Sequence, residues 1–258
     1  MSESSKTMDK IRIGQLTCSP HTIPQFVEEL RCLISHSQQR PRTILCVNAH
    51  VYNLAMKDTK LRQCLNDARI NTADGAAIVW AARFCGGNLP ERCNMTEAFR
   101  AFLNQPDMPE TTAILVGTTD DECEAAARNI NAMQRHCKIT HTYSGFLDDD
   151  AYTKAFRQHS KVDLILLGMS TPRTELTAQL AASIFPNAIV WGIGAGTIRI
   201  YAGTMKEAPV WMRRAGLQWL HRLFSDPRNL WKRYIIGNPQ FILHVLRARF
   251  GKTVNDDR

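Results

Sequence analysis

The 258-residue sequence lacks several features that mark common classes of protein. It contains no run of about 18 apolar residues, so we expect no transmembrane helix. The first ten residues, MSESSKTMDK, are polar and include no apolar core segment, so we expect no signal peptide. We predict that residues 1–10 form a disordered lead-in. No internal repeat or low-complexity segment is visible.

The sequence also lacks a recognisable metal motif. Its eight cysteines form no CxxC pair, and no Cys/His spacing fits a zinc site. With no export signal, we expect reduced thiols in a cytoplasmic protein. The DxD run Asp148–Asp150 lies at a predicted helix start, where acidic side chains interact favourably with the helix dipole. We therefore expect no metal there.

Positive charge is concentrated near the C-terminus. The net charge is +8, and residues 205–258 contain 11 Lys/Arg against 4 Asp/Glu, a difference of +7. Such a block suits nucleic acid, an anionic membrane surface or phosphorylated substrates. It contains no RRM, KH or zinc-finger signature, so we expect no nucleic-acid partner.

Short apolar runs alternate with amphipathic helical segments between residues 11 and 204. The predicted strands are Ile11–Leu16, Thr43–Val47, a short approach to Asp74, Thr112–Gly117, Ile139–Tyr143, Val162–Gly168 and Ala188–Ile193. The predicted helices include His21–Ser37, Asp58–Asn66, Asp120–Met133, Asp148–Gln158 and Pro172–Ile184. This alternation is typical of a parallel sheet covered on both faces. We predict an α/β fold with a Rossmann-like core over residues 11–204.

The pattern changes after residue 204, where no further strand is predicted. Pro209–Phe224, Pro227–Ile236 and Pro239–Phe250 each open with a proline, which suits a first helical turn. We predict a basic helical appendage over residues 205–258. Its apolar stripe, which includes Trp211 and Trp219, suits either packing onto the core or contact with a membrane interface. The two alternatives are compatible.

Asp74 is the first candidate for chemistry. It stands between a strand-like approach and a helix that begins with Ala76-Ala77. In α/β proteins the carboxyl ends of parallel strands form the edge where ligands bind. Asp74 is therefore either a cap of the following helix or a general base at the rim of the sheet.

Other strand ends fall at the same predicted edge. Asn48 follows the strand Thr43–Val47, and the glycine-rich turn GIGAG, residues 192–196, follows the last strand. This turn is either a tight turn or a place where backbone approaches a phosphate. No GxGxxG motif follows the first strand, which disfavours a nicotinamide-dependent oxidoreductase.

These segments together resemble a known family. From residue 43 to 241 the sequence is similar to the WecG/TagA/CpsF glycosyltransferases, glycosyltransferase family 26. The similarity rests on TILCVNAHVYNLA, INTADGAAIVWAAR with GGNLPERC, ILVGTTDDECEAAA, DLILLGMSTPRTE, and APVWMRRAGLQWLHRLFSDPRNLWKRYIIGNP. The final segment is long and distinctive, which makes the match specific.

The resemblance implies a bacterial, inverting hexosyltransferase with a UDP-sugar donor and no metal or other cofactor. The implied acceptor is a sugar linked to polyprenyl pyrophosphate, used in capsule, exopolysaccharide or other cell-surface polysaccharide synthesis. The implied location is peripheral, on the anionic inner face of the cytoplasmic membrane. The sequence leaves the oligomeric state open, a homo-oligomer included.

The resemblance also implies roles for particular residues. Asp74 corresponds to the proposed base, Asn48 to a donor-side asparagine, and Arg92 to the arginine of LPER. Basic residues of the C-terminal segment are expected over the active site. The candidates here are Arg222, Arg228 and Lys232.

The sequence departs from the family pattern at the presumed substrate edge. Thr174 precedes Glu175 where many members have glutamine. The turn that contains Gly194 and Gly196 continues as Thr197-Ile198-Arg199 where many members have GGxxD. We expect Thr174, Gly194 and Gly196 to contact substrate, but N-acetylmannosamine is not assumed as the donor sugar.

Overall fold

The computed structural model describes residues 8–36, 42–133 and 135–250. At its centre is a six-stranded sheet whose strands all run parallel, in the order β4-β3-β8-β7-β5-β6. The strands are β3 (Thr43–Val47), β4 (Ile70–Ala73), β5 (Thr111–Gly117), β6 (Cys137–Tyr143), β7 (Leu164–Gly168) and β8 (Ile189–Gly192). The predicted α/β class and Rossmann-like parallel sheet are confirmed.

Side chains alternate between the two faces of the sheet, as strand geometry requires. In β5, for example, Ile114 and Val116 join one buried cluster while Ala113 and Leu115 join the other. Because both faces are apolar, both are covered by helices, which is the arrangement expected of a parallel sheet. The sheet therefore lies between two helical layers.

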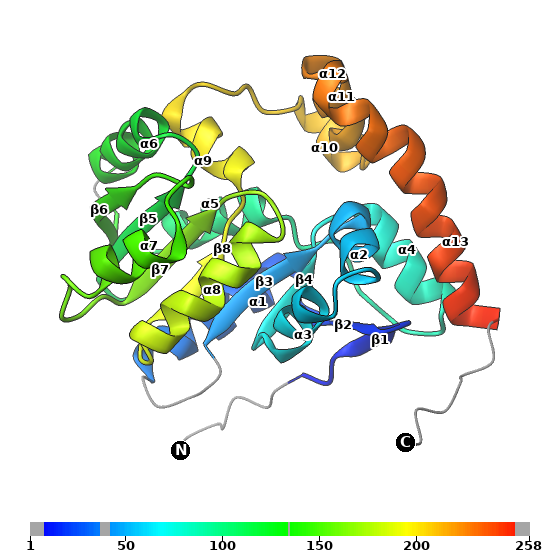
Figure 1. The fold of residues 1–258 in the computed structure, drawn as a ribbon, viewed down its shortest axis with the longest axis horizontal. Helices are drawn as coiled ribbons and strands as arrows, with labels where there is room; N and C mark the ends of the chain where they lie inside the picture. The colour runs from blue at the N-terminus through cyan, green and yellow to red at the C-terminus, as the bar shows by residue number, and fades with distance from the viewer. Residues whose placement is uncertain (1–7, 37–41, 134, 251–258) are drawn as a thin grey trace.

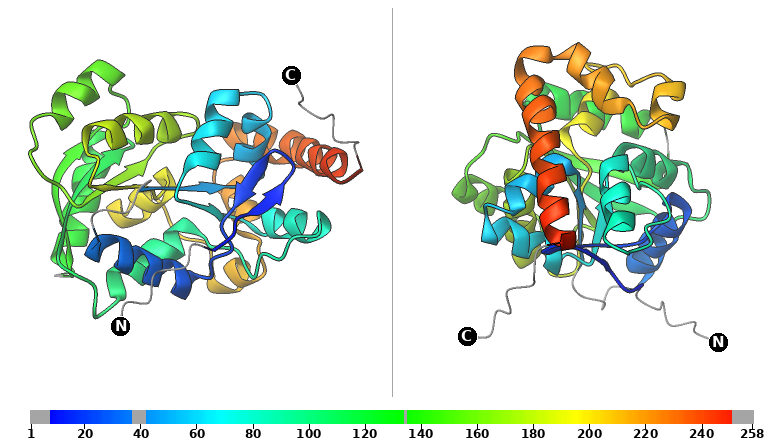
Figure 2. Two further views of the ribbon diagram at one scale, coloured as in Figure 1. Left: turned by 90° about the horizontal axis from the view of Figure 1, so that it is seen from below. Right: turned by 90° about the vertical axis from the view of Figure 1, so that its right-hand side faces the viewer.

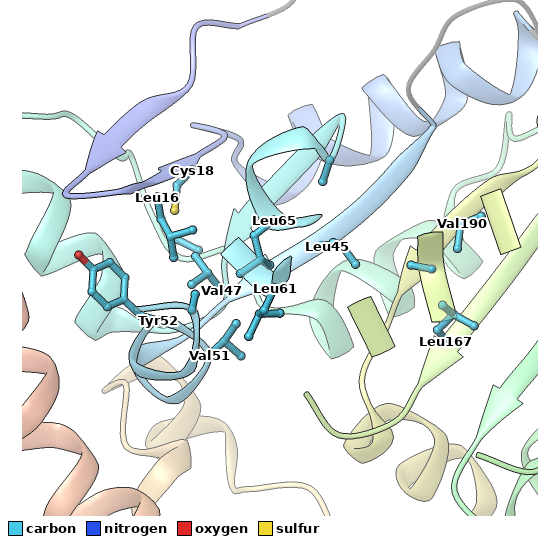
Figure 3. Close-up of a cluster of buried hydrophobic side chains, with 14 of the residues drawn as sticks. Leu16, Cys18, Leu45, Val47, Val51, Tyr52, Leu61, Leu65, Leu167 and Val190 are labelled. Carbon is cyan, nitrogen blue, oxygen red and sulfur yellow. The ribbon is translucent and has the colours of Figure 1, made fainter. Parts of the chain in front are cut away.

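The first face is covered by α2 (Ala49–Ala55), α3 (Thr59–Asp67), α7 (Asp149–Phe156) and α8 (Arg173–Ile184). Figure 3 shows part of this cluster, with Leu45 and Val47 of β3 pointing toward Leu61 and Leu65 of α3. A short antiparallel hairpin, β1 (Ile11–Ile13) and β2 (Leu16–Cys18), adds Leu16 and Cys18 to the cluster.

The second face is covered by α1 (Ile23–Ser35), α5 (Met95–Asn104), α6 (Asp120–Ala132) and α9 (Ala195–Ala202). The fully buried Trp191 of β8 packs here against Phe26, Phe99 and Phe102. The α4 helix (Ala76–Phe84) follows β4, which is an edge strand of the sheet. It lies beside the C-terminal helix (Figure 1).

Three local features differ from the sequence-based expectations. The predicted strand Ile11–Leu16 is a hairpin, because Gly14 adopts a left-handed conformation with φ of +59°. The helix α9 after the glycine turn was not predicted. The predicted helix Pro209–Phe224 is two helices, α10 (Val210–Arg214) and α11 (Gln218–Ser225), separated at Gly216 with φ of +72°.

The last helical segment is continuous rather than divided at Pro239. It runs through α12 (Pro227–Trp231), a π-helical turn η1 (Lys232–Ile236) and α13 (Gly237–Phe250). This long helical segment runs beside α2 and α4 in Figure 1 and is seen from another side in Figure 2. A π-helical turn widens the backbone locally, and here it ends two residues short of Pro239.

The C-terminal segment packs closely on the α/β core. Phe241 and Val245 are buried in the same cluster as Tyr52. The rings of Tyr52 and Phe241 pack edge to face, with their centroids 5.2 Å apart. The side-chain amide of Asn53 donates a hydrogen bond to the Gly237 carbonyl. Among the described residues, no helix is both long and apolar enough to cross a membrane. The predicted lead-in lies mostly outside the described residues, as does the chain beyond residue 250.

Candidate active site

Two cavities adjoin at the carboxyl edge of the sheet. The first, of about 340 Å³, is bordered by Cys46 of β3, Thr174 and Glu175 of α8, and the glycine turn at Gly194; we call it the strand-end cavity. The second, of about 390 Å³, lies between α4 and the C-terminal segment; we call it the appendage cavity. Its lining includes Ala76, Trp80, Trp219, Tyr234, Phe241 and Ile242. Polar groups make up a larger share of the lining in the first cavity than in the second.

A small set of polar residues borders both cavities. Its members come from the ends of β3 and β4, the start of α5, and the C-terminal helices. They are Asn48, His50, Asp74, Asn94, Gln218, Arg222 and Arg233. A molecule in either cavity therefore reaches the same group of side chains.

Asp74 is at the centre of this shared set, directly after β4. Within the described residues no side chain caps α4, so the cap alternative is not realised there. Asp74 Oδ1 instead accepts hydrogen bonds from Asn94 Nδ2 at 2.7 Å and from the Met95 backbone N–H at 3.3 Å. These bonds fix the carboxyl group against the start of α5.

Two opposing effects act on the pKa of Asp74. Burial is the larger effect and raises this pKa above its ordinary value, while Arg222, the Met95 N–H and Arg233 lower it. Burial penalises the charged form, and nearby cations favour it. The arrangement gives a carboxyl group that lies in the field of nearby arginines yet accepts a proton more readily than an exposed aspartate.

Arg222 and Arg233 border both cavities and supply positive charge there. The Gly196 position lies so close to Arg222 that an added Cβ would be 2.9 Å from its Nη2. Arg233 Nη2 is 3.5 Å from Asn48 Oδ1, and burial lowers the pKa of this guanidinium. Glycine at position 196 therefore lets a guanidinium approach the turn.

Several predicted residues at this edge have clear local functions. Asn48 caps α2, since its Oδ1 accepts from the backbone N–H groups of His50 and Val51. Thr174 is buried, and its hydroxyl accepts a hydrogen bond from the Met169 N–H at 3.2 Å. Gly194 has φ of +83° and begins α9. All three border the strand-end cavity.

Arg92 borders the appendage cavity but is largely engaged by protein groups. It donates to the Gln218 side chain at 3.0 Å, to the Arg213 carbonyl at 3.0 Å, and to Glu97 at 3.1 Å. Arg213 in turn pairs with Glu207 at 3.2 Å. These contacts join α5 to α10 and α11.

The structure separates Arg228 and Lys232 from the other predicted residues. Both are exposed, and within the described chain neither borders either cavity. The Lys232 ammonium lies 5.7 Å from the centre of the Trp231 ring. Their expected contact with substrate has no support in this arrangement and stays a prediction.

Sequence reasoning did not single out three residues that border the strand-end cavity: His50, Glu175 and Arg233. Burial and the neighbouring Arg233 lower the pKa of His50 to about 4, so this imidazole is neutral at pH 7. Arg233 adjoins the predicted Lys232, but only the helical geometry tells which of the two faces the cavity. His50 lies two residues after Asn48, which is the signal that could have indicated it.

The acidic run after β6 acts as a helix start, as predicted. Asp148 accepts a hydrogen bond from the Ala151 N–H at 2.8 Å and caps α7, while Asp149 and Asp150 lie in its first turn. Among the described residues, no three His, Cys, Asp or Glu side chains are grouped so as to hold a metal ion.

Comparison with known proteins places this arrangement in a family. Residues 11–255 match the model of the glycosyl transferase WecG/TagA/CpsF family. A protein of Bacillus subtilis (strain 168), described as N-acetylglucosaminyldiphosphoundecaprenol N-acetyl-beta-D-mannosaminyltransferase, is 24% identical over 90% of this chain and 92% of its own length. A protein of Staphylococcus aureus (strain MW2) with the same description is 25% identical over 88% of this chain and 89% of its own. Because the family model spans nearly the whole sequence, the chain belongs to the glycosyl transferase WecG/TagA/CpsF family.

Proposed function

We propose that the protein transfers a hexose or N-acetylhexosamine, with inversion, from a UDP-sugar to a sugar linked to polyprenyl pyrophosphate. The observation that carries the proposal is the pair of cavities that adjoin at Asp74. Transfer needs donor and acceptor to approach one carboxylate from two sides. The two relatives support a lipid-linked acceptor, since their descriptions name N-acetylglucosaminyldiphosphoundecaprenol.

The strand-end cavity suits the donor. It follows the carboxyl ends of β3 and β8, where open α/β sheets bind nucleotides. Gly194 opens α9 there, and backbone N–H groups at a helix start favour negatively charged phosphate oxygens. Arg222 and Arg233 add charged donors on the side of Asp74. A diphosphate between the glycine turn and these arginines would direct its sugar toward Asp74.

The appendage cavity suits the lipid-linked acceptor. Trp80, Trp219, Phe241 and Ile242 give it an apolar wall, while Asp74 and Arg222 stand at its inner end. A polyprenyl pyrophosphate has the same two parts, an apolar chain and a charged head. We therefore assign the acceptor sugar to the end of this cavity nearest Asp74.

The chemistry follows from this placement. The Asp74 carboxylate takes the proton of the acceptor hydroxyl as the oxygen forms its bond to the anomeric carbon. On the opposite face the bond from that carbon to the phosphate oxygen breaks, and UDP leaves with the electron pair. General-base assistance contributes about 10²–10⁴-fold. Arg222 and Arg233 stabilise the charge that develops on UDP, as preorganised donors do in other transferases.

The membrane contact follows from the surface of the C-terminal segment. Trp211, Phe224, Ile235 and Phe250 are exposed there, each by more than half of its surface. Aromatic side chains on basic helices suit the interface of an anionic membrane. We propose that this face docks on the inner surface of the cytoplasmic membrane, which brings the appendage cavity to its lipid-linked substrate.

A donor screen tests the function. Thermal unfolding is measured with a panel of UDP-sugars. The mass of the product formed on a synthetic lipid pyrophosphate acceptor is then measured by mass spectrometry. We expect UDP and one or a few UDP-sugars to raise the melting temperature, and the acceptor mass to increase by one hexose or N-acetylhexosamine. A melting temperature that no uridine nucleotide raises would contradict the proposal.

A further inference from the structure

Glu175 is a second buried carboxyl group at the strand-end cavity, and the mechanism above does not use it. It lies in the first turn of α8 and is 4% exposed. Its Oε1 accepts a hydrogen bond from the Thr171 hydroxyl at 3.0 Å. Its Oε2 has no hydrogen-bond partner among the described residues, although the residue borders the cavity. A buried oxygen left without a partner is costly in a folded protein.

Glu175 and Asp74 flank the same strand end. Cys46 of β3 also borders the cavity; burial has the largest effect in raising the pKa of its thiol, and the charges of Asp74 and Glu175 raise it further. The two carboxyl groups therefore border the same cavity, in which the proposed donor sugar lies next to Asp74.

The two carboxyl groups differ in their electrostatic surroundings. Burial raises the pKa of both, but arginines oppose this at Asp74, while at Glu175 the opposing effects come from its own backbone N–H and the Thr171 hydroxyl. Among the described residues, the charge of Glu175 also acts on the thiols of Cys46 and Cys64, whose pKa values are raised mainly by burial. Two acids in different surroundings commonly take different tasks in one site. A carboxyl oxygen with no protein partner can accept a hydrogen bond from a ligand, or donate one when it carries the proton.

We propose that Glu175 is a specificity-determining residue whose carboxyl group forms a hydrogen bond through Oε2 with the donor sugar, at either a hydroxyl or an acetamido group. The inference rests on the proposed function, because it needs the sugar of a UDP-sugar in the strand-end cavity. A site with a buried polar group strongly rejects analogues that leave the group unpaired. The preferred sugar is accordingly the one that presents a hydroxyl or acetamido group to Glu175 Oε2.

Two variants of similar size test the hydrogen bond. Glu175→Gln keeps a hydrogen-bonding group, its amide, whereas Glu175→Met fills much the same volume without one. Dissociation constants for UDP and for the best UDP-sugar of the screen are measured by calorimetry. Glu124→Gln is the matched control, since that carboxyl group is exposed on α6. Thermal unfolding of each variant shows that it folds.

We expect Glu175→Met to weaken UDP-sugar binding about tenfold or more while UDP binding stays within about threefold. Glu175→Gln should retain most of the sugar binding, and Glu124→Gln all of it. The proposal fails if Glu175→Met binds the sugar nucleotide as the wild type does. It also fails if both variants lose it equally, or if UDP binding falls as much as UDP-sugar binding. Wild-type protein that binds no uridine nucleotide would refute the proposed function itself, which is a separate result.

Discussion

At the residue scale, Asp74 combines a raised pKa with fixed orientation. Burial raises its pKa, and the hydrogen bonds from Asn94 and Met95 hold one oxygen in place. In the proposed reaction the second oxygen takes the proton of the acceptor. A general base works best when its pKa approaches the working pH, so burial favours this reaction although it opposes ionisation.

Replacing Asp74 with asparagine tests the base directly. Asp74→Asn keeps an oxygen that can accept from Met95 but cannot take a proton, so turnover should fall about 10²-fold or more. UDP binding, measured by calorimetry, should be retained. Because the raised pKa means that ionised Asp74 destabilises the folded state at neutral pH, the variant should melt at the same or a higher temperature. Near-normal turnover would leave Asp74 with only a structural function.

The pH dependence of kcat/KM provides a second test. The reaction needs the carboxylate, so kcat/KM should fall as the pH drops through the raised pKa of Asp74, with a midpoint above the ordinary value of about 3.9. Arg222 is the strongest of the neighbours that lower this pKa. In Arg222→Ala the acid limb should therefore move to higher pH. Arg214→Ala removes an equal charge from an exposed position and should leave the limb in place.

At the scale of elements, the acidic run Asp148–Asp150 tests the expectation of metal-independent transfer. Asp148 caps α7, and Arg222 and Arg233 are available to UDP. We expect activity to persist in EDTA, and in a variant with Asp148→Asn and Asp150→Asn, because asparagine is also a good cap. Activity that requires Mn²⁺ or Mg²⁺ and disappears in this variant would assign the run to a metal site.

The α13 helix offers a matched pair of neighbouring side chains. Phe241 is 2% exposed and packs on Tyr52, whereas Leu243 is 47% exposed. Phe241→Ala should lower the free energy of unfolding by about 3–5 kcal/mol. Leu243→Ala should change it by no more than about 0.5 kcal/mol. Denaturant unfolding measures both, and equal effects would mean that α13 is not anchored through Phe241.

At the scale of the whole molecule, the C-terminal segment both contributes to the core and lines the two cavities of the candidate active site. Phe241 and Val245 belong to the core cluster, and Arg222 and Arg233 border both cavities. The predicted boundary at residue 204 therefore marks a change in the sequence pattern. Many contacts join the two parts of the chain across this boundary. Whether each part folds alone stays a prediction.

Truncation after Gly203 tests this division. The truncated protein should keep its strands but melt at a lower temperature, because removal of α13 exposes Tyr52 and its neighbours. It should lose liposome binding and most transfer activity. Full-length Arg222→Ala should still bind anionic liposomes while its turnover falls. Full activity of the truncated protein on a water-soluble acceptor would exclude the segment from the chemistry.

Much of the fold was predictable from sequence because its signals are local. The strand Thr43–Val47 has the predicted bounds, and the parallel sheet follows from apolar runs that alternate with amphipathic helices. Asn48, Asp74 and the glycine turn were found as residues that follow strands, and parallel strands bring such residues to one edge. The family motifs, also local, indicated the family to which the chain belongs.

Only the tertiary structure decided which side chains meet. Arg233 lies 185 residues from Asn48 in sequence and contacts it, while Lys232 beside it points elsewhere. Both residues lie in the π-helical turn η1, and only Arg233 borders the cavities. The unpartnered oxygen of Glu175 likewise depends on what several distant segments leave unfilled. Periodicity reports which face of an element is buried, because it repeats within a few residues. Contacts across the cavity depend on how whole elements pack, which no local pattern contains.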